Sequence, residues 1–232
     1  MVSDFTYTGC DNLEVMAEAV NYNAFLVDTV GKHIDSPDMR VLDFGAGSGT
    51  YADMFSARQI TPDCLEPDER LQNILRSKGY RVIAHDAPIP EDERYDLVYT
   101  FNVLEHIKDD QAASERLASL LRPGGTLVVY VPAFEVLFTS MDIKVGHYRR
   151  YRRTQLDRLL RNAGLEIMES RYCDPIGFFA TLAYRAIGSG DGTINPRSLG
   201  LYDRAVFPVS RAMHVLTSKL FGKNVLVVAG TA

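Results

Sequence analysis

The chain has 232 residues, of which 46% are hydrophobic and 24% are charged, and its formal net charge is -5. This apolar content is sufficient for the core of one globular domain, and the acidic balance argues against a protein that coats nucleic acid, because phosphate neutralisation needs a broad basic face. Three cysteines without a Cys-x-x-Cys pair argue against a thiolate metal site and are typical of a reducing compartment.

Strand-like and helix-like segments alternate after an N-terminal cap, about residues 12–36, whose apolar side chains recur at helical spacing. Strands are predicted over residues 40–44, 63–66, 80–84, 95–101, 126–132, 165–172 and 224–230. Helices are predicted over residues 51–58, 68–78 and 109–121, and Thr154 is predicted to open another helix that ends near Gly164. This alternation predicts a doubly wound α/β fold with a mostly parallel sheet, in a single domain of residues 1–232.

The interval between the last two predicted strands, about residues 174–222, contains helical pattern and is far longer than a turn needs. Tyr184, Arg185, Tyr202 and Arg204 lie there among apolar residues. We expect a helical insert that serves as a lid, as a dimer face or as a surface that faces lipid.

The first residues lack the basic and apolar regions of a secretory signal, and the most apolar stretch, residues 177–188, contains Arg185. We therefore expect a cytoplasmic protein without a membrane-spanning helix.

A glycine-rich loop follows the first predicted strand, in the sequence VLDFGAGSGT. Asp43 precedes Gly45, Gly47 and Gly49 where the strand turns into a helix. Glycines let the backbone pass close to a ligand there, and the N–H groups at the helix start favour electron-rich atoms. The dinucleotide pattern would need glycine at position 50, which is threonine; the spacing here, Asp-x-Gly-x-Gly-x-Gly, is less common and more informative.

In order along the chain, this loop, the acid in CLEPD, the segment FNVLEHI and the turn RPGG resemble the class I S-adenosylmethionine (SAM) dependent methyltransferases, from about residue 12 to about residue 172. The resemblance implies a Rossmann-like sheet of seven strands with an antiparallel last strand. It also implies SAM as cofactor, S-adenosylhomocysteine as product, and no metal.

The resemblance assigns roles to the acids at the strand ends. Asp43 would hold the methionine amino group, Glu66 the ribose hydroxyls, and Asp86 the adenine amino group. Phe101, Asn102 and Leu104 would line the methionine and the transferred methyl. The cofactor residues implied in this way are Asp43, Gly45, Ala46, Gly47, Gly49, Glu66, Asp86, Ala87, Phe101, Asn102 and Leu104.

Methyl transfer from a sulfonium needs alignment of nucleophile, methyl and sulfur, and it needs a base only when the acceptor carries a proton at the nucleophilic atom. His106 and His147 are the histidines expected near the methyl, as base or substrate contact. A packing role for His106 behind the cofactor is the alternative.

A basic run, GHYRRYRR at residues 146–153, lies between a predicted strand and the helix opened by Thr154. It resembles a loop found in one branch of these methyltransferases, which implies that His147, Arg149, Arg150 and Tyr151 face the acceptor. An extended run would place His147, Arg149 and Tyr151 on one side. A solvated loop whose arginines pair with nearby acids is the alternative.

Two aromatic residues outside this loop complete the expected acceptor site. Tyr22 on the N-terminal cap and Tyr184 in the insert are candidate substrate contacts, with core packing as the alternative.

The favoured hypothesis is O-methylation of a small anionic metabolite, a carboxylate, phosphate or phosphonate, by direct in-line transfer. One alternative is methylation of a sugar or lipid-linked acceptor with the insert lying against a membrane. Another is a non-catalytic SAM-binding or RNA-associated regulator. A nucleic-acid substrate is not expected, whereas the apolar insert is compatible with peripheral membrane contact or a homodimer.

Overall fold

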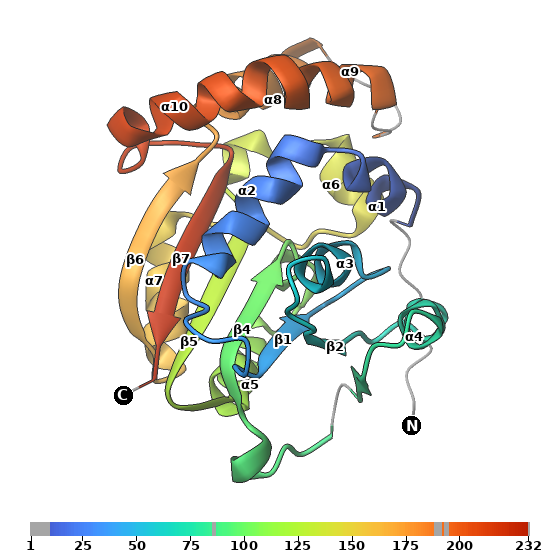
Figure 1. The fold of residues 1–232 in the computed structure, drawn as a ribbon. Coiled ribbons are helices and arrows are strands. Elements are labelled where there is room, and N and C mark those ends of the chain that lie inside the picture. Colours follow the sequence, from blue (N-terminus) through green and yellow to red (C-terminus); the bar gives the residue numbers. More distant parts are fainter. Residues whose placement is uncertain (1–9, 85–86, 188–191, 193–194, 232) are drawn as a thin grey trace.

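A seven-stranded sheet forms the centre of the molecule in the computed structural model, which describes residues 10–84, 87–187, 192 and 195–231 (Figure 1). The strand order is β3-β2-β1-β4-β5-β7-β6. Its members are β1 (Val41–Phe44), β2 (Asp63–Leu65), β3 (Val82–Ile83), β4 (Tyr95–Phe101), β5 (Leu121–Pro132), β6 (Glu166–Cys173) and β7 (Asn224–Gly230). Strand β7 runs antiparallel to both of its neighbours, β5 and β6, and the other pairs of neighbouring strands are parallel. The predicted Rossmann-like fold class, including the antiparallel last strand, is confirmed.

The sheet is buried on both faces, as expected for a mostly parallel sheet covered by helices. Along β5, Leu127, Val129 and Val131 belong to one core, whereas the alternate residues Val128 and Tyr130 belong to the other. This period of two places successive side chains on opposite faces of the strand. The two cores together confirm the doubly wound arrangement.

Helices cover the two faces in separate groups. On the first face lie α5 (Asp110–Leu120) and α7 (Arg153–Asn162), and on the second lie α2 (Val20–Gly31), α3 (Thr50–Ser56) and α10 (Phe207–Thr217). Leu75 of α4 (Glu69–Ser77) packs in a third, smaller core beside β2. The shorter helices α1 (Cys10–Ala17) and α6 (Ser140–Val145) flank the edge at which the parallel strands end (Figure 1).

Element bounds agree with the sequence predictions for β4 and β7 and differ elsewhere. Strand β5 starts five residues earlier than predicted, because Leu121 pairs with Tyr95 before the glycine turn interrupts the register. Strand β3 is only two residues long. Helix α7 starts at Arg153, and the Arg152 backbone N–H donates to Gln155 Oε1 (2.8 Å), so Thr154 lies in the first turn and is not the cap.

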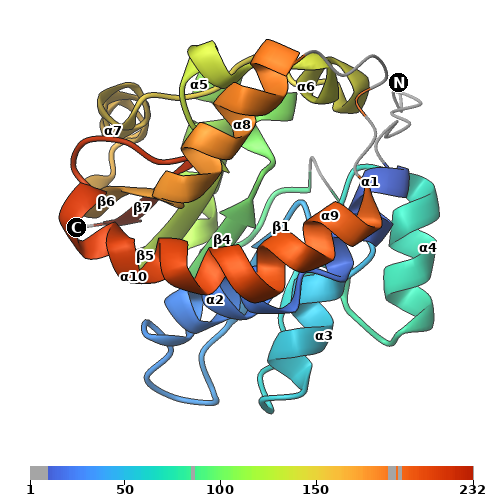
Figure 2. The same ribbon diagram turned by 90° about the horizontal axis from the view of Figure 1, so that it is seen from above.

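The insert forms a helical layer over the carboxyl edge of the sheet. It contains α8 (Pro175–Ile187), α9 (Pro196–Leu201), a π-helical turn (Tyr202–Val206) and α10. Figures 1 and 2 show this layer lying across the ends of the parallel strands and above α2. Within the described residues, no helix is both long and apolar enough to cross a membrane.

The insert is joined to α2 through Asp203. Helix α2 has no side-chain cap of its own. Instead, the Asp203 carboxylate accepts hydrogen bonds from the backbone N–H groups of Asn21 (3.0 Å) and Tyr22 (2.8 Å). These are two of the N–H groups that a helix leaves unsatisfied at its N-terminus. A residue 182 positions away in sequence therefore acts as the cap.

We predict that Asp203→Ala lowers the free energy of unfolding by about 1–2 kcal/mol, the typical cost of removing an N-cap. Urea unfolding followed by circular dichroism measures this change. Asp38→Ala is the matched control, because Asp38 is exposed and the structure gives its carboxylate no hydrogen bond. Equal unfolding free energies for the two variants would contradict the capping role.

Candidate functional site

A cavity of about 520 Å³ opens at the carboxyl ends of β1 and β4. The strand order reverses between these two strands. Open α/β sheets bind ligands at such switch points. The glycine loop, Glu66, Asn102, His106 and Tyr22 line the cavity, and Tyr202 and Phe207 from the insert cover it. The fold therefore brings together residues that are up to 185 positions apart.

The glycine loop needs glycine at the points where it bends. Gly45, Gly47 and Gly49 have φ angles of 82°, 57° and 89°, a region that side chains other than glycine rarely adopt. A Cβ atom on Gly45 would lie 2.4 Å from Val103 Cγ2. The N–H groups of Gly45 and Ala46 donate to the Leu65 carbonyl, so the loop is fixed to β2.

Glu66 lies at the end of β2 with its carboxylate against the loop. Oε2 accepts a hydrogen bond from the Gly47 N–H (2.8 Å), and Oε1 accepts one from the Asp68 N–H (2.9 Å). Burial raises the pKa of Glu66, although these two backbone bonds oppose the rise. Each oxygen keeps a lone pair that could accept from a ligand hydroxyl in the cavity.

Asp43 lies beneath the loop and does not itself line the cavity. It is buried, and its Oδ2 has no hydrogen-bond partner among the described residues. Burial raises the pKa of Asp43 to about 8, and the nearby Glu66 charge adds to the rise. Asp43 is therefore protonated at neutral pH unless a cation enters beside it.

The segment after β4 supplies the floor of the cavity. Phe101 and Asn102 line it, whereas Leu104 is fully buried behind it. Asn102 has a φ angle of 54°, and its Nδ2 donates to Tyr22 Oη (3.3 Å). The Tyr22 ring packs edge-on against Tyr130, with 6.0 Å between ring centroids.

The side chains of the basic run lie on two sides of the loop. They do not follow the strict alternation that would place His147, Arg149 and Tyr151 together. His147 and Arg150 line the cavity. Arg149 instead forms an ion pair with Asp110 (2.6 Å), and Tyr151 Oη donates to the same carboxylate (3.0 Å). Arg150 faces the cavity because it forms an ion pair with a buried acid on α6.

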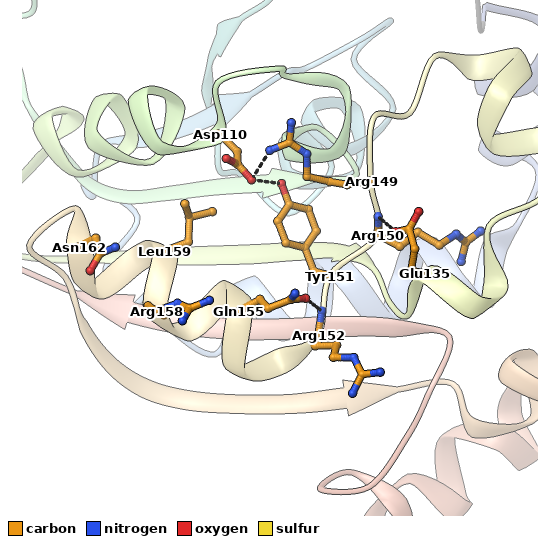
Figure 3. Close-up of a pocket in the computed structure, with 10 residues that line it drawn as sticks. All are labelled: Asp110, Glu135, Arg149, Arg150, Tyr151, Arg152, Gln155, Arg158, Leu159 and Asn162. Atoms are coloured by element: carbon orange, nitrogen blue, oxygen red, sulfur yellow. Dashed lines mark hydrogen bonds and ion pairs between the residues drawn. The ribbon is translucent and has the colours of Figure 1, made fainter.

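A second concavity of about 410 Å³ lies beside α7, where Arg149 and Tyr151 point (Figure 3). Arg152, Arg158 and Glu135 are among its other lining residues. Arg149 and Tyr151 thus lie apart from the residues around the glycine loop.

Asp142 is the buried acid that holds the cavity side of the loop. Its Oδ1 is 2.7 Å from His147 Nδ1 and 2.8 Å from Arg150 Nε, and its Oδ2 is 3.0 Å from an Arg150 terminal nitrogen. Burial alone would raise the pKa of Asp142, but the bonds from His147 and Arg150 hold it well below its usual range. Since an ionised carboxylate only accepts, His147 donates to it through a proton on Nδ1, and its Nε2 lies on the opposite side of the ring.

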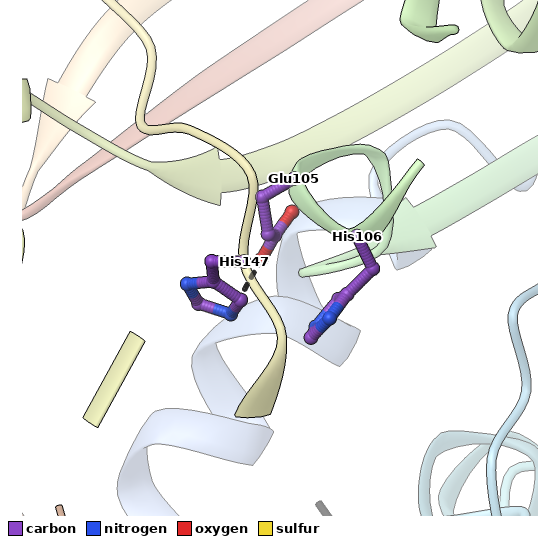
Figure 4. Close-up of side chains that lie close together, drawn as sticks. All are labelled: Glu105, His106 and His147. Carbon is purple, nitrogen blue, oxygen red and sulfur yellow. Dashed lines mark ion pairs between the residues drawn. The ribbon is translucent and has the colours of Figure 1, made fainter. Parts of the chain in front are cut away.

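Glu105, His106 and His147 converge at one end of the cavity (Figure 4). Glu105 is completely buried, and burial raises the pKa of its carboxyl to about 8. Burial lowers the pKa of His106 to about 3, with a smaller contribution from His147. The two imidazole rings meet edge to face, 4.5 Å between centroids. At neutral pH this end therefore holds a neutral carboxyl group beside a neutral His106.

Three further predicted residues do not line the cavity: Gly49, Ala87 and Tyr184 on α8. The Ala87 carbonyl accepts a hydrogen bond from Arg116. Asp86 lies outside the described residues.

Sequence reasoning missed several residues of the site: Asp142, Asp174, Lys223, Tyr202 and Asp203. Asp142 has a local signal, because Thr139 and Asp142 form the Thr-x-x-Asp start of α6, with the Thr139 N–H donating to Asp142 Oδ2 (2.8 Å). Lys223 has no such signal, since it is a single lysine before the last strand.

Comparison with known proteins agrees with this geometry. The family model for a methyltransferase domain matches residues 11–170. A ubiquinone biosynthesis O-methyltransferase from Xanthomonas campestris is 33% identical over 169 residues, which is 63% of this chain and 71% of that protein. A probable SAM-dependent methyltransferase from Mycolicibacterium smegmatis is 31% identical over 139 residues, so the match spans 56% of this chain and about half, 53%, of that relative.

Solved structures show the same fold at low sequence identity. A SAM-dependent methyltransferase from Thermotoga maritima has a TM-score of 0.57 at 18% identity, covering 96% of this chain and 90% of that one. A chain from the complex of the Haloferax volcanii Trm112 methyltransferase activator with a methyltransferase has a TM-score of 0.61 at 16% identity, covering 98% and 97%.

We predict that the raised pKa of Asp43 makes the unfolding free energy of the ligand-free protein depend on pH. In the unfolded chain an aspartate has a pKa of about 3.9, whereas the pKa of Asp43 is about 8 in the fold. Between these values the native state holds a proton that the unfolded chain has released, so the unfolding free energy falls as pH rises. Asp43→Asn should remove this decline. Relative to the wild type, the unfolding free energy of the variant should therefore rise by about 1 kcal/mol or more for each pH unit within that window.

Urea unfolding at several pH values between 5 and 8 measures the difference. Asp38→Asn, at an exposed position, should run parallel to the wild type. Parallel curves for Asp43→Asn as well would show that Asp43 is ionised in the native state.

Proposed function

We propose that this chain, which belongs to the class I SAM-dependent methyltransferases, transfers the methyl group of SAM to an oxygen atom of a small acceptor. The observation that carries the proposal is the cavity at the β1–β4 switch point. It combines the backbone of the glycine loop with the Glu66 carboxylate on one side and histidines on the other. Oxygen as the methylated atom is supported by the names of the Xanthomonas relatives, which are O-methyltransferases.

The cofactor would lie across the glycine loop with its ribose hydroxyls donating to Glu66. The close approach of backbone permitted by Gly45 and Gly47 suits this position. Asp43 would face the methionine ammonium, and this cation would favour the ionised form of a carboxyl that burial otherwise keeps protonated. Asn102 and Phe101 would then line the methionine part.

Transfer would be a direct displacement. The S–CH₃ bond breaks with its electron pair left on sulfur, which gives S-adenosylhomocysteine, while the new bond forms between methyl carbon and acceptor oxygen. The chain contributes mainly alignment, which is worth about 7–11 kcal/mol in well-oriented intramolecular reactions. Tyr22 and Phe207 cover the cavity and would exclude water from the reacting atoms.

The acceptor would occupy the end of the cavity where His106 and His147 lie. An anionic group on it would be bound by Lys223, because both inward-facing and outward-facing arginines of the loop already form ion pairs. Lys223 lines the cavity and forms no ion pair within the described part of the chain. Burial lowers the pKa of Lys223, although Asp174 opposes this effect. An acceptor carboxylate or phosphate beside the amine would favour its charged form.

A lipid-linked acceptor is a second candidate, favoured by the outer surface of the insert. Ile187 and Leu216 are each 85% exposed, and Leu201, Leu220 and Phe179 are also exposed. The described acids of the insert, Asp174 and Asp203, are both buried, whereas its basic residues face outward: Arg185, Arg197, Arg204, Arg211 and Lys219. Exposed apolar side chains beside cations suit an anionic membrane surface.

We predict that Glu66→Gln weakens SAM binding at least tenfold, because the substituted side chain loses the charge that accepts from the ribose hydroxyls. Isothermal titration calorimetry with SAM measures the affinity. Glu69→Gln is the matched control, three residues away and exposed on α4. The same affinity for both variants would contradict the cofactor position.

For the lipid-linked alternative we predict cosedimentation with vesicles of phosphatidylcholine and phosphatidylglycerol, and weaker binding to phosphatidylcholine alone. Ile187→Glu combined with Leu216→Glu should abolish it, whereas Met168→Glu, at an exposed position on β6, should not. Equal loss of vesicle binding in the double variant and in Met168→Glu, or no vesicle binding by the wild type, would contradict the lipid-linked alternative. A soluble acceptor would then be the remaining proposal.

A further inference from the structure

Three side chains at the inner end of the cavity have the composition of a metal site. Glu105, His106 and His147 each offer one ligand atom, and these atoms all lie within 4.8 Å of one another. We propose that they bind a divalent transition-metal cation, and that this cation holds the acceptor. The proposal rests on the proposed function for its role in transfer, although the binding of the cation itself does not.

The geometry is close to what coordination requires. His147 Nε2 lies 3.8 Å from Glu105 Oε1. Metal–ligand bonds of about 2.0–2.2 Å hold neighbouring ligand atoms roughly 3–3.5 Å apart, so Glu105 and His147 would move together only slightly, whereas a pair as far apart as 4.8 Å would have to approach by about 1.5 Å. Figure 4 shows the carboxylate and the two rings gathered around one point, from the turn after β4 and from the loop after α6.

The orientation of His147 is fixed from behind. Its Nδ1–H donates to Asp142, which is itself held by Arg150, and Nε2 therefore points toward Glu105. A carboxylate behind a ligating histidine is the usual outer partner in metal sites, because it sets the tautomer and raises the basicity of the ring. Asp142 is thus a positioning residue for the cation.

Glu105 gives an independent reason to expect a cation. Its side chain is completely buried, yet neither carboxylate oxygen has a hydrogen-bond partner among the residues that the structure describes. Buried polar groups are nearly always paired, and an unpaired buried carboxyl is costly. Its backbone carbonyl, in contrast, accepts from the Tyr148 N–H, so the main chain at this position is satisfied. A bound cation would satisfy the side chain as well, and the proton of the neutral carboxyl group would be released to water on binding.

The ligand set indicates the kind of cation. Two imidazole nitrogens and one carboxylate oxygen suit Zn²⁺, Fe²⁺, Co²⁺ or Mn²⁺ better than Ca²⁺ or Mg²⁺, which prefer oxygen ligands. Three protein ligands leave coordination positions open, as in catalytic sites. His106 and His147 line the cavity, so these open positions face the acceptor.

This arrangement specifies the acceptor class more closely. A molecule with two adjacent oxygens, a hydroxyl beside a second hydroxyl or a carboxylate, would chelate the cation and present one oxygen to the methyl. Coordination favours loss of the hydroxyl proton to water. The oxygen then forms the O–CH₃ bond while the S–CH₃ bond breaks and sulfur keeps the electron pair.

Titration of the chelator-treated full chain with Co²⁺ and with Zn²⁺ tests the proposal, by visible absorption for Co²⁺ and calorimetry for Zn²⁺. We expect one saturable site per chain, with Zn²⁺ displacing Co²⁺. Glu105→Gln and His147→Gln should each weaken binding at least a hundredfold, and Asp142→Asn by about 10–100-fold, as is typical of outer partners. His33→Gln, a histidine outside the cavity, is the matched control and should bind as the wild type does.

SAM affinity of the same metal-free samples, measured by calorimetry, separates the two proposals. Retained SAM binding in His147→Gln shows that the variant is folded, so that its loss of cation binding is specific. No saturable cation binding by the wild type, or unchanged binding in both Glu105→Gln and His147→Gln, overturns the metal site while SAM binding stands. Cation binding without SAM binding would instead overturn the proposed function.

Discussion

The hydrogen bonds of the Asp142 carboxylate determine the geometry of the proposed acceptor end of the site. The carboxylate closes the first turn of α6 through Thr139, and it draws both His147 and Arg150 inward from the basic run. Without this buried anion, His147 and Arg150 would lose the contact that holds them on the cavity side of the loop. Arg149 and Tyr151 bind Asp110 on the other side. One carboxylate therefore decides which cations of the loop face the cavity and fixes the tautomer of its histidine.

The other end of the cavity depends on the sheet. The glycine loop is fixed by β2 through Leu65 and by Glu66, and α2 is held over it by Asp203 from the insert. Cofactor end, cap and insert are thus linked by buried acids that bind backbone N–H groups. Two other acids, Asp43 and Glu105, are also buried, and burial raises the pKa of each to about 8.

Local pattern was sufficient for the sheet and for the glycine loop. Strands β4 and β7 and the glycine loop follow from apolar runs and positive-φ glycines that are contiguous in sequence. The acceptor end was predictable only in part, because its geometry is set by contacts between distant residues: Arg150 with Asp142, Tyr151 with Asp110, and Glu105 with His147. Alternation along an extended strand therefore did not predict which side chains of the basic run face the cavity.

A crystal structure of the full chain with S-adenosylhomocysteine tests the central claim most directly. We expect the ribose hydroxyls to bind Glu66, the homocysteine part to lie beside Asn102, and the sulfur to point toward His106 and His147. Density for the ligand in the concavity beside Arg149 and Arg158, or a sulfur directed away from the two histidines, would contradict it.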